Sequence, residues 1–352
     1  MKKTLLCTSA LALTSITGAA NAVPITAGAV TMDVSGYYTT TFAYTNVTGN
    51  NTSLTGTDYS GVDLNQNTEI WFKPSMTLDN GIKIAVDVQL EGGSGTGNTA
   101  GAATDIIDES YMTISGNFGK VIIGSENSVG YKMTVTAPDV SSLYAQSSSL
   151  TSFVPYSSGT AGADLFRGTL GATTIENDRN NDAQRISYFS PRFSGLQLGI
   201  SYARDAGQGN GAIDNNATTT DIVDIAANYS GSFGGVDVNA SARYGTANAP
   251  GGAVNPEVWG AGLNVGMSGF TFGGSYAEQD GTALRDGNSY DVGLGYANGP
   301  MSYSLTYFHG MNRDNALGVA NEYLKTYVLA VKYKVAANFK VGAMIANTEF
   351  TS

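Results

Sequence analysis

Regular alternation of apolar and polar residues is the feature that most restricts how this chain can fold. In the segment 82–91, the even positions carry Ile82, Ile84, Val86, Val88 and Leu90. The odd positions carry Lys83, Ala85, Asp87, Gln89 and Glu91, so formal charges run along the whole polar face. A period of two is that of a β-strand with one apolar and one polar face. The same period recurs from residue 32 to the end of the chain and predicts an all-β protein.

Residues 1–22 have the composition of a cleaved signal peptide. Lys2 and Lys3 are followed by a largely apolar stretch, and Ala20-Asn21-Ala22 fits a small-x-small cleavage site. The single cysteine, Cys7, lies inside this leader, so the exported chain cannot form a disulfide. We therefore expect one exported domain, residues 23–352, because no linker divides it.

The exported chain is strongly acidic. Removing Lys2 and Lys3 leaves 16 of the 18 basic residues against 29 acidic ones, a net charge of −13. Such a chain repels phosphate backbones, so binding of nucleic acid is not expected.

Alternation alone does not distinguish a soluble sandwich from a membrane barrel, but the lengths of the connections do. Short ones fall at residues 79–81, 117–119, 191–195, 230–235, 268–269, 298–300 and 336–338. Long ones fall between them, at 45–65, 92–104, 125–182, 205–219, 246–256, 279–287 and 311–320. A meander with all its tight turns at one end is typical of a transmembrane antiparallel β-barrel, in which the apolar face meets lipid and the polar face lines a wet lumen.

The third long connection is unusual. It separates GNFGKVIIGSEN (residues 116–127) from RISYFSPRFSG (residues 185–195) and is too polar to bury a core of its own. Loops of this length are rare in compact domains and are usually functional or disordered. We expect residues 125–182 to fold into the mouth of the barrel and narrow it.

These two motifs resemble those of Gram-negative general porins, in the branch typical of alphaproteobacteria. The resemblance runs from residue 32 to the end and implies a 16-stranded porin-type barrel that forms a homotrimer. It also implies a location in the bacterial outer membrane, contact with membrane lipid and lipopolysaccharide, and folding by the barrel-assembly machinery.

The strand count departs from this family. The pattern predicts fifteen strands, whereas single-chain barrels of this type have an even number. The chain ends in Glu349-Phe350-Thr351-Ser352, so we expect that the last strand is missing from this sequence. Alternatively, Phe350 serves as the aromatic terminal signal that these porins carry.

Charged residues near the expected constriction form the candidate site. The acidic side is predicted to be Asp139, Asp164, Glu176 and Asp178, from the inward loop. The basic side is predicted to be Lys73, Lys83, Arg185 and Arg243, from the wall. Opposed arcs of charge at a narrow polar pore select ions by sign. With a net charge of −13, a weak cation preference is expected.

No enzyme is expected. His309 is the sole histidine, whereas outer-membrane phospholipases and omptin proteases need a placed histidine with polar partners. The run 176–182 offers oxygen ligands for Ca²⁺ but lacks EF-hand spacing, so no metal or cofactor is expected.

The predicted function is passive diffusion of small hydrophilic solutes. A specific sugar or phosphate channel is one alternative, for which Tyr37 and Trp71 are the visible aromatic lining candidates. A non-conducting surface barrel or adhesin is the other.

Overall fold

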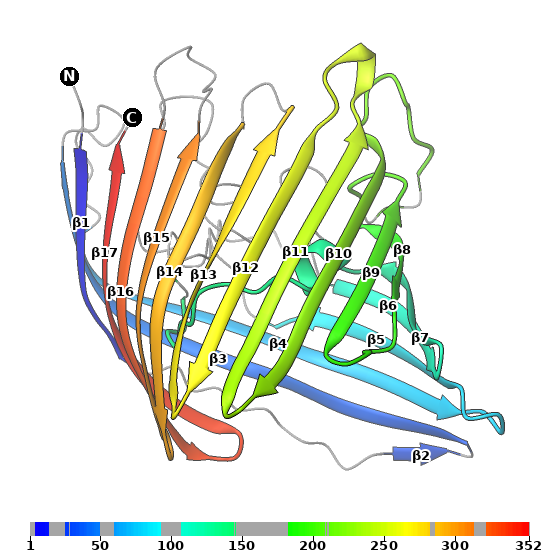
Figure 1. Cartoon of the computed structure of the whole chain (residues 1–352), viewed down its shortest axis with the longest axis horizontal. Coiled ribbons are helices and arrows are strands. Elements are labelled where there is room, and N and C mark those ends of the chain that lie inside the picture. Colours follow the sequence, from blue (N-terminus) through cyan, green and yellow to red (C-terminus); the bar gives the residue numbers. More distant parts are fainter. Residues whose placement is uncertain are drawn as a thin grey trace.

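One antiparallel sheet contains most of the chain in the computed structural model (Figure 1). The structure describes residues 4–13, 25–27, 29–49, 60–92, 107–143, 145, 182–207, 209, 211–281, 286–312 and 322–351. The first strands after the leader are β2 (Ile25–Ala27), β3 (Val30–Gly49), β4 (Gly61–Thr77), β5 (Lys83–Glu91), β6 (Ile107–Gly116) and β7 (Gly119–Ser125). Next come β8 (Gln184–Phe189), β9 (Leu196–Ala203), β10 (Thr220–Phe233), β11 (Val236–Asn248) and β12 (Glu257–Met267). The last are β13 (Phe270–Asp280), β14 (Gly287–Asn298), β15 (Met301–Asn312), β16 (Glu322–Ala336) and β17 (Phe339–Thr351).

The strands form an up-and-down meander, as the connection lengths predict. Each strand from β3 to β17 pairs antiparallel with the next one in the chain. These fifteen strands confirm the predicted all-β class and strand count.

The gap between the two ends of the meander is filled by β1 (Thr4–Leu13). This strand pairs antiparallel with β17, from Thr4 opposite Thr351 to Leu13 opposite Ala343. It also pairs antiparallel with β3, where Leu5 lies opposite Gly49. Residues of the predicted leader thus complete a ring of sixteen strands. Removal of residues 1–22 on export stays a prediction.

Short turns at one end of the ring rest on residues that tolerate positive φ. At the β4–β5 turn, Gly81 has φ 81° and donates its N–H to the carbonyl of Leu78 at 2.8 Å. At the β12–β13 turn, Gly269 has φ 85°. These are left-handed backbone conformations that glycine adopts without steric cost. They fix the hairpin registers and therefore decide which side chains lie opposite each other across the wall.

The two faces of the wall differ as the barrel interpretation requires. On β9, Leu198 and Ile200 are 54% and 50% exposed, whereas Ser201 and Ala203 are 2% and 1% exposed. The same alternation of exposed apolar and buried small residues runs along β12 and β14, and β8 also alternates between exposed and buried positions. Exposure of so many contiguous apolar side chains is typical of a surface that faces lipid.

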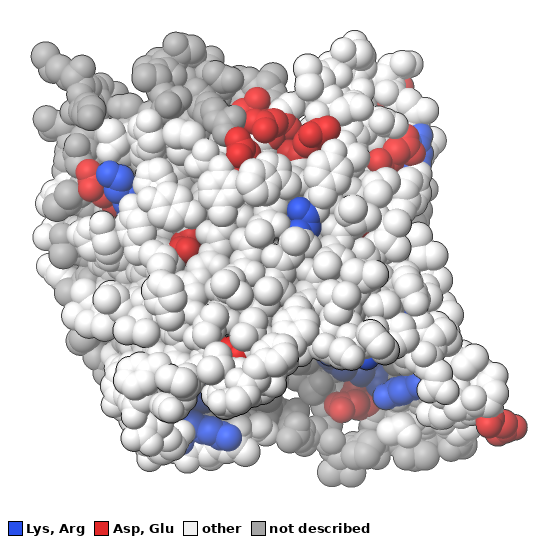
Figure 2. Space-filling view, in the orientation of Figure 1, with Lys and Arg blue, Asp and Glu red and all other residues white. Residues whose placement is uncertain are grey.

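Charges and aromatic rings gather toward the ends of the strands. Figure 2 shows a face that is mostly uncharged, with a group of acidic residues over the ends of β12–β14 that meet the long connections. At this end, Trp259 lies 5.1 Å from Tyr276, centroid to centroid. At the turn end, Phe270 lies 4.4 Å from Tyr296. Amphipathic rings at two levels are typical of the girdles at membrane interfaces.

Among the described residues, no helix is both long enough and apolar enough to cross a membrane.

A charge placed on the outward face should destabilise the protein, whereas one on the inward face should not. Leu263 points outward near the middle of β12 and is 48% exposed, and Asn239 points inward from β11. We expect Leu263→Lys to cost about 2–4 kcal/mol of folding free energy in a bilayer. Asn239→Lys is the matched control and should fold like the parent. Reversible folding into lipid vesicles in urea measures both, and equal losses would contradict the assigned orientation.

Candidate functional site

The inward segment begins with one short helix. Helix α1 (Val129–Lys132) starts at Ser128, whose hydroxyl accepts a hydrogen bond from the N–H of Tyr131 at 3.1 Å. Such a cap satisfies one of the free N–H groups of a first helical turn. The chain then continues in extended form along the inside of the wall, and residues 128–143 together form a strap (Figure 1).

The first anchor of the strap is apolar. Val129 and Met133 are 0% and 3% exposed and pack against Ile122, Phe189 and Ala226 on β7, β8 and β10. The candidate site predicted from the sequence contains charged residues and does not include these apolar ones. Their burial fixes α1 against the wall, because apolar surface removed from water stabilises the contact.

Polar side chains of the wall bind the backbone of the strap in its middle part. Five hydrogen bonds follow one another along β11, β12, β14 and β15. They run from Val135 N to Ser241 Oγ at 2.8 Å, Asn264 Nδ2 to Thr136 O at 3.0 Å, Ala137 N to Asp291 Oδ1 at 3.0 Å, Thr306 Oγ1 to Pro138 O at 2.8 Å, and Val140 N to Ser304 Oγ at 2.9 Å. Backbone groups that would otherwise be buried without partners are thereby satisfied.

Glycines in the wall give the strap its path. A Cβ at Gly262 would overlap the carbonyl oxygen of Val135, and one at Gly293 would come within 2.8 Å of the carbonyl oxygen of Pro138. On the same face of β12, a Cβ at Gly266 would meet nothing closer than 3.5 Å. The strap therefore lies in direct contact with the backbone of the wall at specific positions.

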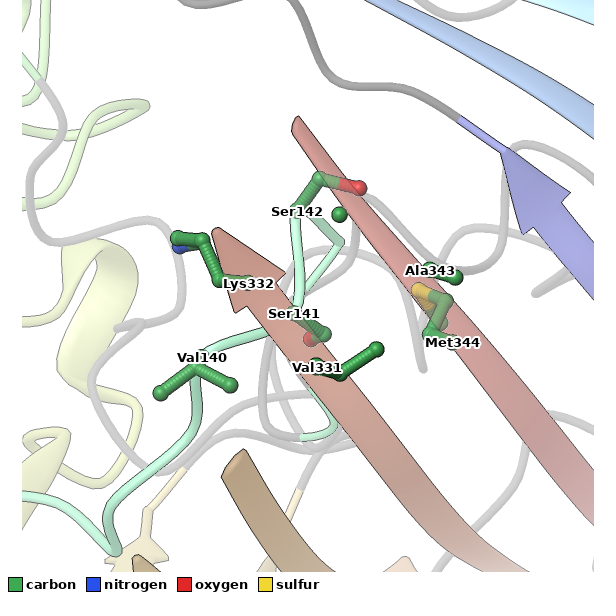
Figure 3. Close-up of a pocket in the computed structure, with 8 residues that line it drawn as sticks. Val140, Ser141, Ser142, Val331, Lys332, Ala343 and Met344 are labelled. Carbon is green, nitrogen blue, oxygen red and sulfur yellow. The ribbon is translucent and has the colours of Figure 1, made fainter. Parts of the chain in front are cut away.

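The second anchor is again apolar. Leu143 is buried with Phe308, Val328 and Met344, and Val140 packs beside them. Figure 3 shows Val140 and Ser141 of the strap facing Val331, Lys332 and Met344 of β16 and β17. The cavity left between them measures about 10 Å³, which is roughly the space of one water molecule. The strap thus spans the lumen wall from β7 to β17.

Two predicted bases are buried on the inner wall. Arg185 and Arg243 are 4% and 7% exposed. The guanidinium carbon of Arg243 is 3.0 Å from the place where a Cβ of Gly130 would stand, and one of its nitrogens lies 3.8 Å from Asp224 Oδ1. The structure therefore places Arg243 between wall and strap, and it buries Arg185 near the start of β8.

The other two predicted bases lie on β4 and β5. Lys73 pairs with Asp87 at 2.9 Å and lies 4.2 Å from the centre of the Trp71 ring. Lys83 is exposed at the turn end of β5. Neither lysine is thereby brought to Asp139.

Of the predicted loop acids, the structure describes Asp139. Its carboxylate accepts hydrogen bonds from the N–H groups of Ser141 and Ala145, both at 2.8 Å. Asp139 thus shapes the end of the strap. Asp164, Glu176 and Asp178 lie outside the described residues, and so does most of the run 176–182.

A cluster of acids on the wall was not predicted. Carboxylate oxygens of Glu69, Glu91 and Asp108 lie within 4.8 Å of one another on β4, β5 and β6. Glu69 also accepts hydrogen bonds from the hydroxyl of Tyr37 and, at 2.7 Å, from the indole N–H of Trp71. These five side chains form one polar patch on the inner wall.

A β-bulge explains why Asp108 belongs to this cluster. Val88 pairs with Ser110 but Leu90 pairs with Ile107, so Gln89 faces two residues, Asp108 and Glu109. Gln89 donates a hydrogen bond to Glu109 at 2.7 Å. A bulge turns both residues toward one side, which strict alternation does not anticipate.

The two ends of the long connection between β7 and β8 meet beside this patch. Asn127 Nδ2 donates to Glu109 Oε1 at 2.9 Å and to Asp182 Oδ1 at 2.7 Å. Glu126 is fully buried and pairs with Lys132 at 2.7 Å. Burial raises the pKa of the Asp182 carboxyl to about 7, and the nearby charge of Asp108 adds to the rise.

His309 belongs to the outward face. It lies in the aromatic level near the long connections, 5.1 Å from Tyr290 and 5.8 Å from Tyr323 between ring centres.

A closed antiparallel ring with apolar residues outside, polar residues inside and a strap across its inner wall defines an outer-membrane β-barrel channel. The chain belongs to the Gram-negative porin family, which its sequence matches over residues 8–352. Family and fold therefore point to a channel rather than an enzyme, located in the bacterial outer membrane.

Solved structures of low sequence identity share the fold. A loop-deletion mutant of OmpT, an outer membrane protein of Vibrio cholerae, is 14% identical with a TM-score of 0.56, over 92% of this chain and 99% of that one. A porin refined at 1.8 Å is 14% identical with a TM-score of 0.53, over 99% and 100%. Salmonella typhi OmpF in complex with daunomycin is 14% identical with a TM-score of 0.54, over 93% and 100%. A comparison with curated proteins finds no match.

A side chain at Gly262 should move the strap. We expect Gly262→Ala to push the Val135 carbonyl toward the lumen and to lower single-channel conductance in planar bilayers. Gly266→Ala, on the same face of β12, leaves room for its methyl group and should conduct like the parent. Equal conductance of the two variants would show that the strap does not lie on β12.

Proposed function

We propose that the chain is a passive diffusion channel for small hydrophilic solutes and ions, with a weak preference for cations. The observation that carries this proposal is the strap. Its ties to β11–β15 keep it against the wall rather than across the whole lumen. A ring of this size, whether β1 or another strand joins β17 to β3, is wide enough to leave an aqueous channel beside the strap.

The cation preference rests on the wall cluster rather than on the predicted loop acids. Glu69, Glu91 and Asp108 converge within 4.8 Å, whereas Arg185 and Arg243 are buried. Charge that faces the lumen acts on permeating ions, since it is only partly screened within about 10 Å at 0.1 M salt. The sign of the net charge, −13 after leader removal, agrees with this.

A channel with a sugar site is the second candidate. Tyr37 and Trp71 lie 5.7 Å apart, centre to centre, with their rings at 61° on the inner wall. Aromatic faces beside carboxylates suit a sugar, because apolar ring faces and hydroxyl groups are recognised together. A single aromatic pair offers little surface for stacking sugars. We therefore favour unspecific diffusion over a sugar-specific channel.

Assembly and biogenesis complete the proposal. We infer that the chain forms a homotrimer in contact with lipopolysaccharide, after leader removal and insertion by the barrel-assembly machinery. A trimer form is known for OmpT of Vibrio cholerae, a fold relative at 11% identity. The contiguous apolar outer face supports lipid and subunit contact.

Liposome swelling with sugars of increasing size tests the transport class. Rates that fall smoothly with solute size are expected. Saturable uptake of one sugar would instead favour the specific channel, and no uptake at all would favour a non-conducting barrel.

Reversal potentials in a KCl gradient test the charge selectivity. The double variant Glu69→Gln, Glu91→Gln should shift the potential toward zero, because it removes two lumen charges that lie directly opposite each other. Glu257→Gln, Asp280→Asn is the matched control, since it removes a cross-strand acid pair from the outward face. An anion-selective parent, or equal shifts in both variants, would refute the assignment.

A further inference from the structure

Hydrogen bonds join the two ends of the long connection between β7 and β8, just before β8 begins. The hydroxyl of Ser125, the last residue of β7, donates to the carbonyl of Asp182. The N–H of Glu126 donates to the carbonyl of Ala183 at 3.3 Å. The residues that precede and follow this connection are therefore held together next to β6, where β7 ends and β8 begins.

Two carboxyl groups share one amide at this junction. The Nδ2 group of Asn127 has two hydrogens, one for Glu109 Oε1 at 2.9 Å and one for Asp182 Oδ1 at 2.7 Å. Asp182 is 4% exposed, so little water reaches it. When two carboxylates share such a site, ionisation of both is opposed and one proton is retained between them.

The surrounding charges do not remove this repulsion. The titratable groups that face Asp182 come from β6, from α1 and its N-terminal flank, and from β8. They are Asp108, Glu109, Glu126, Tyr131, Lys132 and Arg185. Lys132 forms an ion pair with Glu126 at 2.7 Å. Arg185 lies near Asp182, and its single positive charge is outnumbered by Asp108, Glu109 and Asp182 when all three are ionised.

We propose that Asp182 and Glu109 form a proton-sharing pair that sets the charge selectivity of the pore around neutral pH. Below the transition the pair holds one proton and carries a single negative charge. Above it the proton passes to water and the pair carries two. The added charge lies beside the acid cluster of β4–β6 and attracts cations into the same lumen.

This inference rests on the proposed cation preference and deepens it. The raised pKa of Asp182, about 7, agrees with the geometry. An aspartate with a raised pKa is largely protonated at pH 6 and largely ionised at pH 8. Cation selectivity should therefore increase as pH rises through 7, in a range where an exposed carboxylate no longer titrates.

Reversal potentials of the full porin in a KCl gradient, measured at pH 6 and pH 8, test the pair. We expect the parent to become more cation-selective at pH 8. Asp182→Asn should lose this increase, because it removes the carboxyl group that releases its proton in this pH range. Asp79→Asn is the matched control: it removes an exposed charge from the β4–β5 turn and should keep the increase.

Glu109→Gln gives an independent test should Asp182→Asn fail to fold. It keeps an acceptor for Asn127 and should also lose the increase. A parent with no change between the two pH values, or a variant of either carboxyl that keeps the full change, would overturn the inference. A parent that is anion-selective at both pH values, yet shows the shift, would refute the proposed cation preference and leave the pair intact.

Discussion

Hydrogen bonding of the backbone within the sheet is the constraint on which the structure depends. In a bilayer an unpaired N–H or C=O group finds no water, so a spanning sheet must close on itself. Strands β3–β17 leave two edges, and β1 pairs with both. Residues 4–13 suit this position by composition, since a largely apolar run of ten residues has the length of a membrane strand and is too short for a membrane helix. The edges of β17 and β3 are thus able to take one further antiparallel strand.

The same constraint governs the strap. An extended segment inside a barrel exposes its own N–H and C=O groups, and apolar packing alone would leave them without partners. The wall supplies serine, threonine, asparagine and aspartate side chains from four strands, separated from the strap by 106 to 168 residues along the sequence. Small polar residues on the inner face therefore have two roles. Some of these residues line the lumen, and others bind the strap. Only the fold shows which residues do which.

The fold followed from local patterns in the sequence, whereas much of the site did not. Alternation and turn spacing predicted the strands, their order and the face that meets lipid, because each depends on neighbouring residues. Alternation also predicted that Arg185 and Arg243 point inward. That α1 would cover Arg243 depends on contacts of Val129 and Met133 with β7, β8 and β10, which no local pattern contains. The bulge at Asp108 and Glu109 is a second such case, because one extra residue reverses the face that a strict period assigns.

The acid cluster of β4 and β5 could have been found from the sequence, and the reason is geometric. The turn at residues 79–81 is centred on Asn80, so residues equally distant from it along the hairpin lie opposite each other. Glu69 therefore faces Glu91, and Trp71 faces Gln89. Lys73 and Asp87 are likewise equidistant from Asn80, and they form the ion pair at 2.9 Å. Net charge gave only the sign of the expected selectivity. The register gives the position of the selective charge. It pairs Lys73 with Asp87 and places Glu69 beside Glu91 on neighbouring strands of the lumen wall.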